Sequence, residues 1–156
     1  MYSPIVFWIV SLISIIRETE EKKMDRSQVA DVYLSDWQYE WRNPYAEEPS
    51  DNVATNYYVT IADHSGRTWC HNFGLSSASH PYWECQERIS KLVERIKNHL
   101  EAGGSINLDH WDEGTPRYGS EAWIRFEREE LQPVGIALSE GRLHEDDLSE
   151  RVRGYF

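Results

Sequence analysis

The sequence predicts an α+β fold: an antiparallel sheet of three to four strands with one long amphipathic helix packed across one face. Three observations predict it. Residues 56–73 alternate in the manner of a β-hairpin, residues 80–102 repeat with a helical period, and the elements follow in the order strand, hairpin, helix, strand. With 156 residues, the chain has room for one compact domain with a modest core.

The hairpin at residues 56–73 has the clearest strand pattern. Successive side chains of a strand point to opposite faces, so alternate residues share a face. Tyr57, Val59 and Ile61 share one face of the first arm, and Trp69, His71 and Phe73 share one face of the second arm. Residues 63–66, Asp-His-Ser-Gly, have turn chemistry between the arms, and Gly66 can take a positive φ.

The helix at residues 80–102 has a single apolar stripe, formed by Ile89, Leu92, Val93, Ile96 and Leu100. Ser79 or His80 can cap its start, and Pro81 fits its first turn. Gly103-Gly104 is expected to end it. A helix with one apolar stripe must pack against another element. We expect it to cover the hairpin face that carries Tyr57, because the side chains on that face are the larger ones.

The remaining segments are less regular. Residues 29–41 predict a strand with a bulge near Ser35-Asp36, because two alternating registers meet there. Residues 105–108 alternate briefly between polar and apolar side chains. Residues 121–127 predict a further strand, since Ala122, Ile124 and Phe126 alternate with other residues.

Two long loops separate these elements. Residues 42–55 contain two Pro, two Asn and three acids, and residues 109–118 contain Gly and Pro. After Pro133 the chain becomes polar and acidic, with a weak helical pattern at residues 146–152. We therefore expect one α+β domain at residues 24–130, followed by an acidic C-terminal tail at residues 131–156.

The first 23 residues differ from the rest. Residues 4–16 are apolar apart from two Ser, and residues 17–23 are strongly polar. At about 13 residues, the apolar run is shorter than a membrane-spanning helix requires. It also lacks the positive start and cleavage site of a signal peptide. Residues 1–23 are either sequence upstream of a true start at Met24, a helix packed on the domain, or a short membrane anchor.

The formal net charge of −11 lies mainly on the flanks of the chain. Residues 17–52 hold ten acids against five bases, residues 105–156 hold twelve against six, and residues 53–104 are balanced. An acidic surface repels phosphate backbones, so direct nucleic-acid binding is not expected. A basic partner, such as a protein that itself binds nucleic acid, fits this charge. Acidity for solubility alone is the other interpretation.

The residues best suited to metal binding or nucleophilic catalysis are Cys70, His80 and Cys85. Thiols and imidazoles are zinc ligands, but His71 points away from Cys70 on the same strand and no Cys-x-x-Cys pair is present. Cys85 lies near a helix N-terminus, where a thiol pKa falls in principle, and could act as a nucleophile. The alternative is that these side chains are ordinary, partly buried residues, reduced or joined in one disulfide.

Other catalytic patterns are weak. Acids near His110, namely Asp109, Asp112, Glu113 and Glu121, are expected to be solvated, because a small sheet and one helix do not form the deep cleft of a glycosidase. The sequence has no phosphate-binding Gly-rich motif and no nucleophile elbow. We expect no cofactor and no catalytic residues.

The chain is rich in aromatics, with seven Trp, nine Tyr and four Phe. Some could form an exposed surface for a protein partner, since aromatic residues are enriched at such interfaces. The candidates for this interaction surface are Tyr58, Trp69, His110, Trp111, Tyr118 and Trp123. The alternative is that the aromatics fill the core, which a small domain needs.

Residues 106–123, INLDHWDEGTPRYGSEAW, carry a His-Trp pair and a Pro-x-Tyr-Gly-Ser-Glu-Ala segment before an aromatic residue. With the preceding hairpin and helix, this layout resembles small uncharacterised bacterial proteins of phages and other mobile elements. The resemblance covers about residues 53–125. It implies a bacterial, phage-linked, intracellular setting and no catalytic role.

These features favour a non-enzymatic, cytoplasmic protein-binding module of phage or mobile-element origin. In its sharper form, it is an acidic inhibitor of a host nucleic-acid-binding protein. The first alternative is a small zinc-binding protein or enzyme that uses Cys70, His80 and Cys85. The second is a peripheral membrane protein anchored by residues 4–16.

Overall fold

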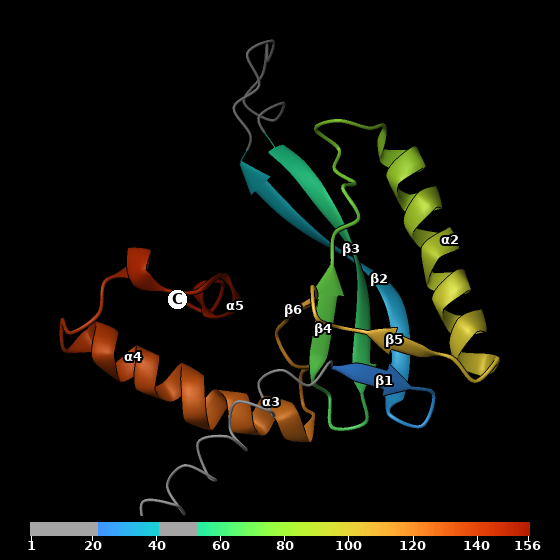
Figure 1. Cartoon of the computed structure of the whole chain (residues 1–156). Helices are drawn as coiled ribbons and strands as arrows, with labels where there is room; N and C mark the ends of the chain where they lie inside the picture. Colours follow the sequence, from blue (N-terminus) through green and yellow to red (C-terminus); the bar gives the residue numbers. More distant parts are fainter. Residues whose placement is uncertain (1–21, 41–52) are drawn as a thin grey trace, which may run out of the picture.

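The structure, a computed structural model, describes residues 22–40 and 53–156. It has an α+β architecture, as predicted, but its strands form two antiparallel sheets where one was expected (Figure 1). The strands are β1 (Lys23–Asp25), β2 (Val29–Glu40), β3 (Val53–Asp63), β4 (Thr68–His71), β5 (Ser105–Asn107) and β6 (Asp112–Glu113). The helical elements are α2 (Tyr82–Glu101), α3 (Glu121–Phe126), a π-helical turn (Glu127–Leu131), α4 (Gln132–Ser139), a 3₁₀ turn (Glu145–Asp147) and α5 (Glu150–Arg153).

The larger sheet has the strand order β2-β3-β4-β6, and β1 pairs with β5 in the smaller one. Strand β2 confirms the strand predicted at residues 29–41, but its irregularity lies between Val29 and Asp31. Pairing continues without a break through Ser35 and Asp36. Trp37 and Tyr39 differ in register from Val32 because they lie on the opposite face, so no bulge is needed there.

The predicted hairpin is formed by β3 and β4. Ile61 pairs with Trp69 and Val59 with His71, so these four side chains share one face. Gly66 has a φ of +94°, as its turn requires. The Asp63 carboxylate stabilises the turn by accepting hydrogen bonds from the amides of Ser65 and Arg67 at 2.9 and 3.0 Å. Of the loop predicted at residues 42–55, residues 42–52 lie outside the described residues, and residues 53–55 belong to β3.

Helix α2 supplies much of the first core. Its buried residues Cys85, Ile89, Val93 and Leu100 belong to one cluster with the β3 side chains that point inward, namely Tyr57, Val59 and Ile61. The Tyr57 hydroxyl is buried and has no hydrogen-bond partner in the described part of the chain. Gly103, with a φ of +89°, follows the helix end. At the other end Pro81 occupies the cap position, and no side chain caps the helix.

The strand predicted at residues 121–127 is wrong, because this segment is helix α3. The Ser120 side chain accepts a hydrogen bond from the amide of Trp123 at 3.1 Å, which caps the helix start. The buried residues Ala122, Trp123 and Phe126 lie at helical spacing on one face. Ala122 and Phe126 of the alternating set lie in this buried stripe, whereas Ile124 is 62% exposed.

Three further helical elements, α4, the 3₁₀ turn and α5, lie in the segment expected to be an acidic tail with a weak helical pattern at residues 146–152. Trp123 and Phe126 of α3 join Leu148 and Val152 in a second core. Pro133 lies at the start of α4, where its missing amide costs little. In Figure 1, α2 lies along one side of the larger sheet, and α3 to α5 lie on the other side.

The turn of the hairpin joins the two cores. The amide of Ala122 donates to the Ser65 carbonyl, and the amide of Arg117 donates to the Gly66 carbonyl, both at 2.9 Å. The contact is close: a Cβ at Gly66 would lie 2.3 Å from the Cβ of Ser120. Only glycine fits this position, both for its φ and for its space.

Arg151 holds α5 in place. Its guanidinium donates to the Gly114 carbonyl at 3.2 Å and to Glu130 at 2.8 Å, and it lies 4.7 Å from the centre of the Phe126 ring. These contacts join α5 to α3, to the π-helical turn and to the segment after β6. One partly buried arginine thus links the C-terminal helices to each other and to the sheet.

Replacing Gly66 tests the contact between the cores. Gly66→Ala should lower the free energy of unfolding by about 2–4 kcal/mol, because positive φ costs about 1 kcal/mol and the overlap with Ser120 adds to it. Gly74→Ala is the matched control: its φ is +78°, but an added Cβ meets nothing within 4 Å. It should cost only about 1 kcal/mol. Urea unfolding followed by circular dichroism measures both, and equal losses would contradict the close contact.

Replacing Arg151 tests the attachment of the C-terminal helices. Arg151→Ala should destabilise them by about 2 kcal/mol, because charge-assisted hydrogen bonds and the stack on Phe126 are lost together. The amides of Phe126 and Val152 should then exchange hydrogen faster, while those of β3 stay protected. Arg128→Ala is the control, because that side chain is 68% exposed and should change stability by less than about 0.5 kcal/mol. Equal protection in the two variants would contradict this role.

Candidate interaction surface

The six residues predicted to form an interaction surface divide by burial. Trp69 is 7% exposed and belongs to the first core, and Trp123 is 8% exposed and belongs to the second. Both therefore fill the core, which was the alternative interpretation. Tyr58 and Trp111 are half-buried, whereas His110 is exposed and Tyr118 is 88% exposed.

His110 and Trp111 lie beside two residues that the sequence analysis had placed only on the hairpin. The His71 ring stacks on Trp111 with centroids 5.7 Å apart and contacts Phe73 edge-on at 4.6 Å. A His71 ring nitrogen lies 3.2 Å from the His110 carbonyl oxygen. The antiparallel pairing of Cys70 with Asp112 brings these residues together. Tyr118 belongs to a different cluster, with its ring 5.2 Å from Trp123.

The structure does not bring Cys70 and Cys85 together. Cys70 pairs with Thr60, so it points to the opposite face of the sheet from Trp69, His71 and Val59. Cys85 is buried in α2 within the core on the Val59 face. The sheet thus separates the two thiols, and both cysteines are free. They cannot join one zinc site or one disulfide within this fold.

Burial raises the pKa of both thiols above the usual value. The carboxylates of Asp112 and Glu150 raise that of Cys70 further. The expected lowering of the Cys85 pKa at the helix N-terminus is outweighed by this burial. His80 contacts the Ser79 hydroxyl at 2.9 Å through its ring. No group of three potential metal ligands is found among residues 22–40 and 53–156.

The acids near His110 have separate partners. Asp109 accepts a hydrogen bond from the Lys22 amide at 3.0 Å, Glu113 pairs with Arg67 at 3.1 Å, and Glu121 lies 3.8 Å from Arg125. Asp112 is exposed. Surface ion pairs of this kind are structural or solvated, and they do not form the facing carboxylates that glycoside hydrolysis needs.

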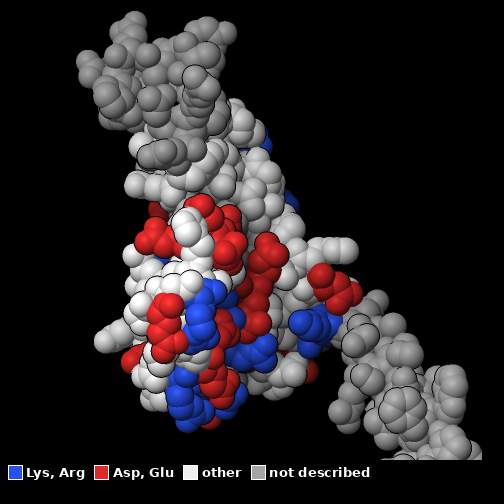
Figure 2. Space-filling model, turned by 90° about the vertical axis from the view of Figure 1, so that its left-hand side faces the viewer, with Lys and Arg blue, Asp and Glu red and all other residues white. Residues whose placement is uncertain are grey.

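The C-terminal helices carry the most uneven charge. Residues 121–156 hold nine acids and five Arg. Four of these arginines pair with glutamates of the same region: Arg125 with Glu121, Arg128 with Glu129, Arg142 with Glu140, and Arg151 with Glu130. Figure 2, which views this side, shows acidic and basic side chains intermixed. The negative charge of this region is therefore concentrated at the acids that form no ion pair with an arginine.

Apart from Glu127, the acids that are not paired with these arginines lie at residues 145–150. Within the described part of the chain, Glu145, Asp147 and Glu150 form no ion pair with a lysine or arginine. A hollow of about 220 Å³ lies beside them. Its lining residues are Glu145, Asp146, Leu148, Arg153 and Phe156. We call Glu145, Asp146, Asp147, Glu150, Tyr155 and Phe156 the acidic surface.

The sequence predicts an acidic tail here, with a weak helical pattern at residues 146–152. In the structure, the 3₁₀ turn and α5 lie in this segment, followed by Tyr155 and Phe156, which are 46% and 50% exposed. The available signal was the spacing of Leu148 and Val152 at i and i+4, which is that of a helix face. This spacing predicts a buried helix face only once Trp123 and Phe126 are known to pack against it.

Comparison of the chain with protein-family models, curated proteins and solved structures finds no match. Among the described residues, no helix is both long and apolar enough to cross a membrane. The apolar run at residues 4–16, on which an anchor would depend, lies outside the described residues. The function of this chain therefore has to be inferred from its own surfaces.

The thiols offer a test of the site geometry. In the folded protein, Cys70 should react with a disulfide reagent faster than Cys85, because Cys70 is half-buried and Cys85 is fully buried. Both rates should keep rising with pH above about 8.5, since the raised pKa values leave little thiolate below that pH. Cys70→Ser and Cys85→Ser variants identify which thiol reacts. Rapid reaction of Cys85 at neutral pH would contradict this arrangement.

Proposed function

We propose that the protein is a non-enzymatic binding module that uses the acidic surface to bind a basic segment of a partner protein. In its sharper form, it inhibits a host nucleic-acid-binding protein by occupying the basic site that would contact nucleic acid. The setting that fits is a phage or mobile element in a bacterial cytoplasm, as the resemblance of residues 53–125 implies. The proposal depends on one observation: unpaired acids beside a small hollow with exposed aromatic rings.

The hollow has the chemistry to hold a lysine or arginine side chain. Glu145 and Asp146 provide carboxylates, and Leu148 and Phe156 provide an apolar lining. Arg153 also lines the hollow, and its guanidinium donates to the Leu148 carbonyl at 3.0 Å. The long side chains of lysine and arginine have an apolar stem and a charged end, which suits such a mixed lining. Tyr155 and Phe156 would add aromatic contact area, which often dominates binding energy at protein interfaces.

The charge pattern supports a protein partner over nucleic acid. The four internal ion pairs leave an excess of acid, so the surface repels phosphates and attracts a basic protein. Attraction of this kind mainly increases the rate of association and weakens as salt is added. A mimic of nucleic-acid charge needs this property, because it has to compete with nucleic acid for the same basic site.

The geometry gives less support to the zinc protein or enzyme. That alternative needs Cys70 and Cys85 in one site, and the sheet lies between them. A role for residues 4–16 in membrane attachment stays a separate hypothesis, which cell fractionation tests. Metal analysis of the purified protein tests the zinc alternative, since about one equivalent of zinc that is lost in Cys85→Ala would favour it.

The test is affinity capture from bacterial lysate, with the captured proteins identified by mass spectrometry. The full chain should capture basic, nucleic-acid-binding proteins at low salt. Combined Glu145→Gln, Asp146→Asn and Asp147→Asn should reduce their capture about tenfold, because local charge steers association. Added DNA should compete with the protein for the same partner.

The matched control removes three charges elsewhere. Glu87→Gln, Glu94→Gln and Glu101→Gln change the net charge by the same amount but lie on exposed positions of α2. This variant should capture the partner as the original chain does. Equal loss in both variants would show that only net charge matters, and recovery of no basic protein would contradict the proposal.

A further inference from the structure

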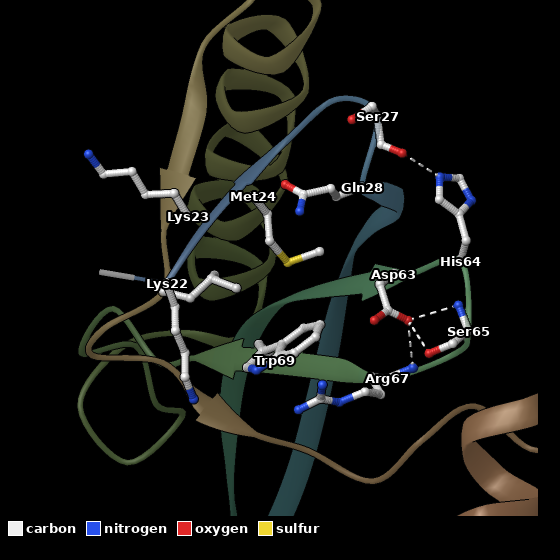
Figure 3. Close-up of a pocket in the computed structure, with 11 residues that line it drawn as sticks. Lys22, Lys23, Met24, Ser27, Gln28, Asp63, His64, Ser65, Arg67 and Trp69 are labelled. Carbon is white, nitrogen blue, oxygen red and sulfur yellow. Dashed lines mark hydrogen bonds between the residues drawn. The ribbon is translucent and has the colours of Figure 1, made fainter. Parts of the chain in front are cut away.

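A second hollow lies between β1 and the β3–β4 turn, away from the acidic surface (Figure 3). Its volume of about 640 Å³ is within the usual range of small-molecule sites. The lining residues come from three separate parts of the chain: Lys22, Lys23, Met24, Ser27, Gln28, Asp63, His64, Ser65, Arg67, Trp69 and Leu108.

The charge of this hollow is opposite to that of the chain. Lys22, Lys23 and Arg67 contribute positive charge, and Asp63 is the single acid in the lining. The Asp63 carboxylate is already engaged, because its Oδ1 accepts from the Ser65 amide, the Ser65 hydroxyl and the Arg67 amide at 2.9, 2.7 and 3.0 Å. In a protein with a net charge of −11, the hollow is therefore a locally positive site.

The hollow also has an apolar floor. Met24, Trp69 and Leu108 line it and are 8%, 7% and 2% exposed, so they belong to the rigid first core. The Arg67 guanidinium lies 4.9 Å from the centre of the Trp69 ring. This stack, with the ion pair to Glu113 at 3.1 Å, holds the guanidinium at the edge of the hollow.

Figure 3 shows the Lys22 and Arg67 side chains extending on the same side of Trp69, whereas Lys23 extends away from it. Lys22 forms no ion pair with the residues that the structure describes. A planar guanidinium and an ammonium are well suited to one carboxylate or phosphate group. The Ser27 and Gln28 side chains stand at the opposite rim and can hydrogen-bond the rest of a ligand.

We propose that this hollow binds a small organic anion. The carboxylate or phosphate group lies between Lys22 and Arg67, and the apolar or planar body of the ligand lies over Met24, Trp69 and Leu108. A neutral ligand would leave the Lys22 ammonium without an ion pair among the described residues, whereas Arg67 already pairs with Glu113. A bare inorganic anion would leave the apolar floor uncovered. The site is separate from the acidic surface, so this inference does not depend on the proposed function.

The test is an NMR titration of the full chain at low salt with benzoate, adenosine monophosphate and inorganic phosphate. Binding should shift the amide of Ser65, the side-chain amide of Gln28 and the indole of Trp69. At least one organic anion should bind about tenfold more tightly than inorganic phosphate, because it also covers the apolar floor. The first two probes distinguish a carboxylate site from a phosphate site.

Three variants locate the anion. Arg67→Gln and Lys22→Gln should each weaken binding about tenfold, through the loss of a charge-assisted hydrogen bond. Glu113→Gln should strengthen it, because the Arg67 guanidinium is released from its ion pair. Lys91→Gln is the control: it removes the same charge from α2, where Lys91 pairs with Glu87, and should leave binding unchanged.

Thermal unfolding of each variant checks that the fold is retained. Binding of the organic anions that is lost in Arg67→Gln and gained in Glu113→Gln supports the site. Three outcomes would overturn it: no shift of these three groups with any probe at millimolar concentration, equal affinity for inorganic phosphate, or equal weakening in Lys91→Gln.

Discussion

The two-sided burial of β3 is the constraint on which the rest of the structure depends. Its inward side chains, Tyr57, Val59 and Ile61, are fully buried with α2, and Thr60 and Ala62 are buried on the other face. A strand buried on both faces fixes its register strongly, because a slip of one residue would exchange the two sets. The register of β3 sets the positions of β4, of Gly66 in the turn and of the helices docked there. The basic hollow beside the turn and the hollow beside the acidic surface are both formed by elements that are positioned in this way.

Much of the first core follows from local patterns in the sequence. The alternation at Tyr57–Ile61, the turn that ends in Gly66 and the stripe of α2 each carry their own signal, because strand and helix periods are local properties. The α3 segment shows the limit of such patterns. Over six residues, the alternation that predicts a strand and the face of a short helix select overlapping side chains, and the cap at Ser120 decides between them.

The candidate sites depend on contacts that no local pattern contains. Trp69 and Trp123 looked available for a partner, but the pairing of β4 with β6 and the docking of α5 bury them. The acids of the acidic surface are held in one place because Leu148 and Val152, which lie among them in the sequence, pack against Trp123 and Phe126. The basic hollow combines residues near 22, 65 and 108. Pairings between distant segments are where tertiary structure overrides sequence patterns.

The separation of Cys70 from Cys85 has a further consequence for oxidation. Because the sheet lies between the two thiols, no disulfide can close within one folded molecule. Oxidation of the folded protein can join Cys70 only to a thiol of another molecule, and it leaves Cys85 in the core. Disulfide formation by the folded chain would therefore link molecules together and would add no internal crosslink to stabilise the fold.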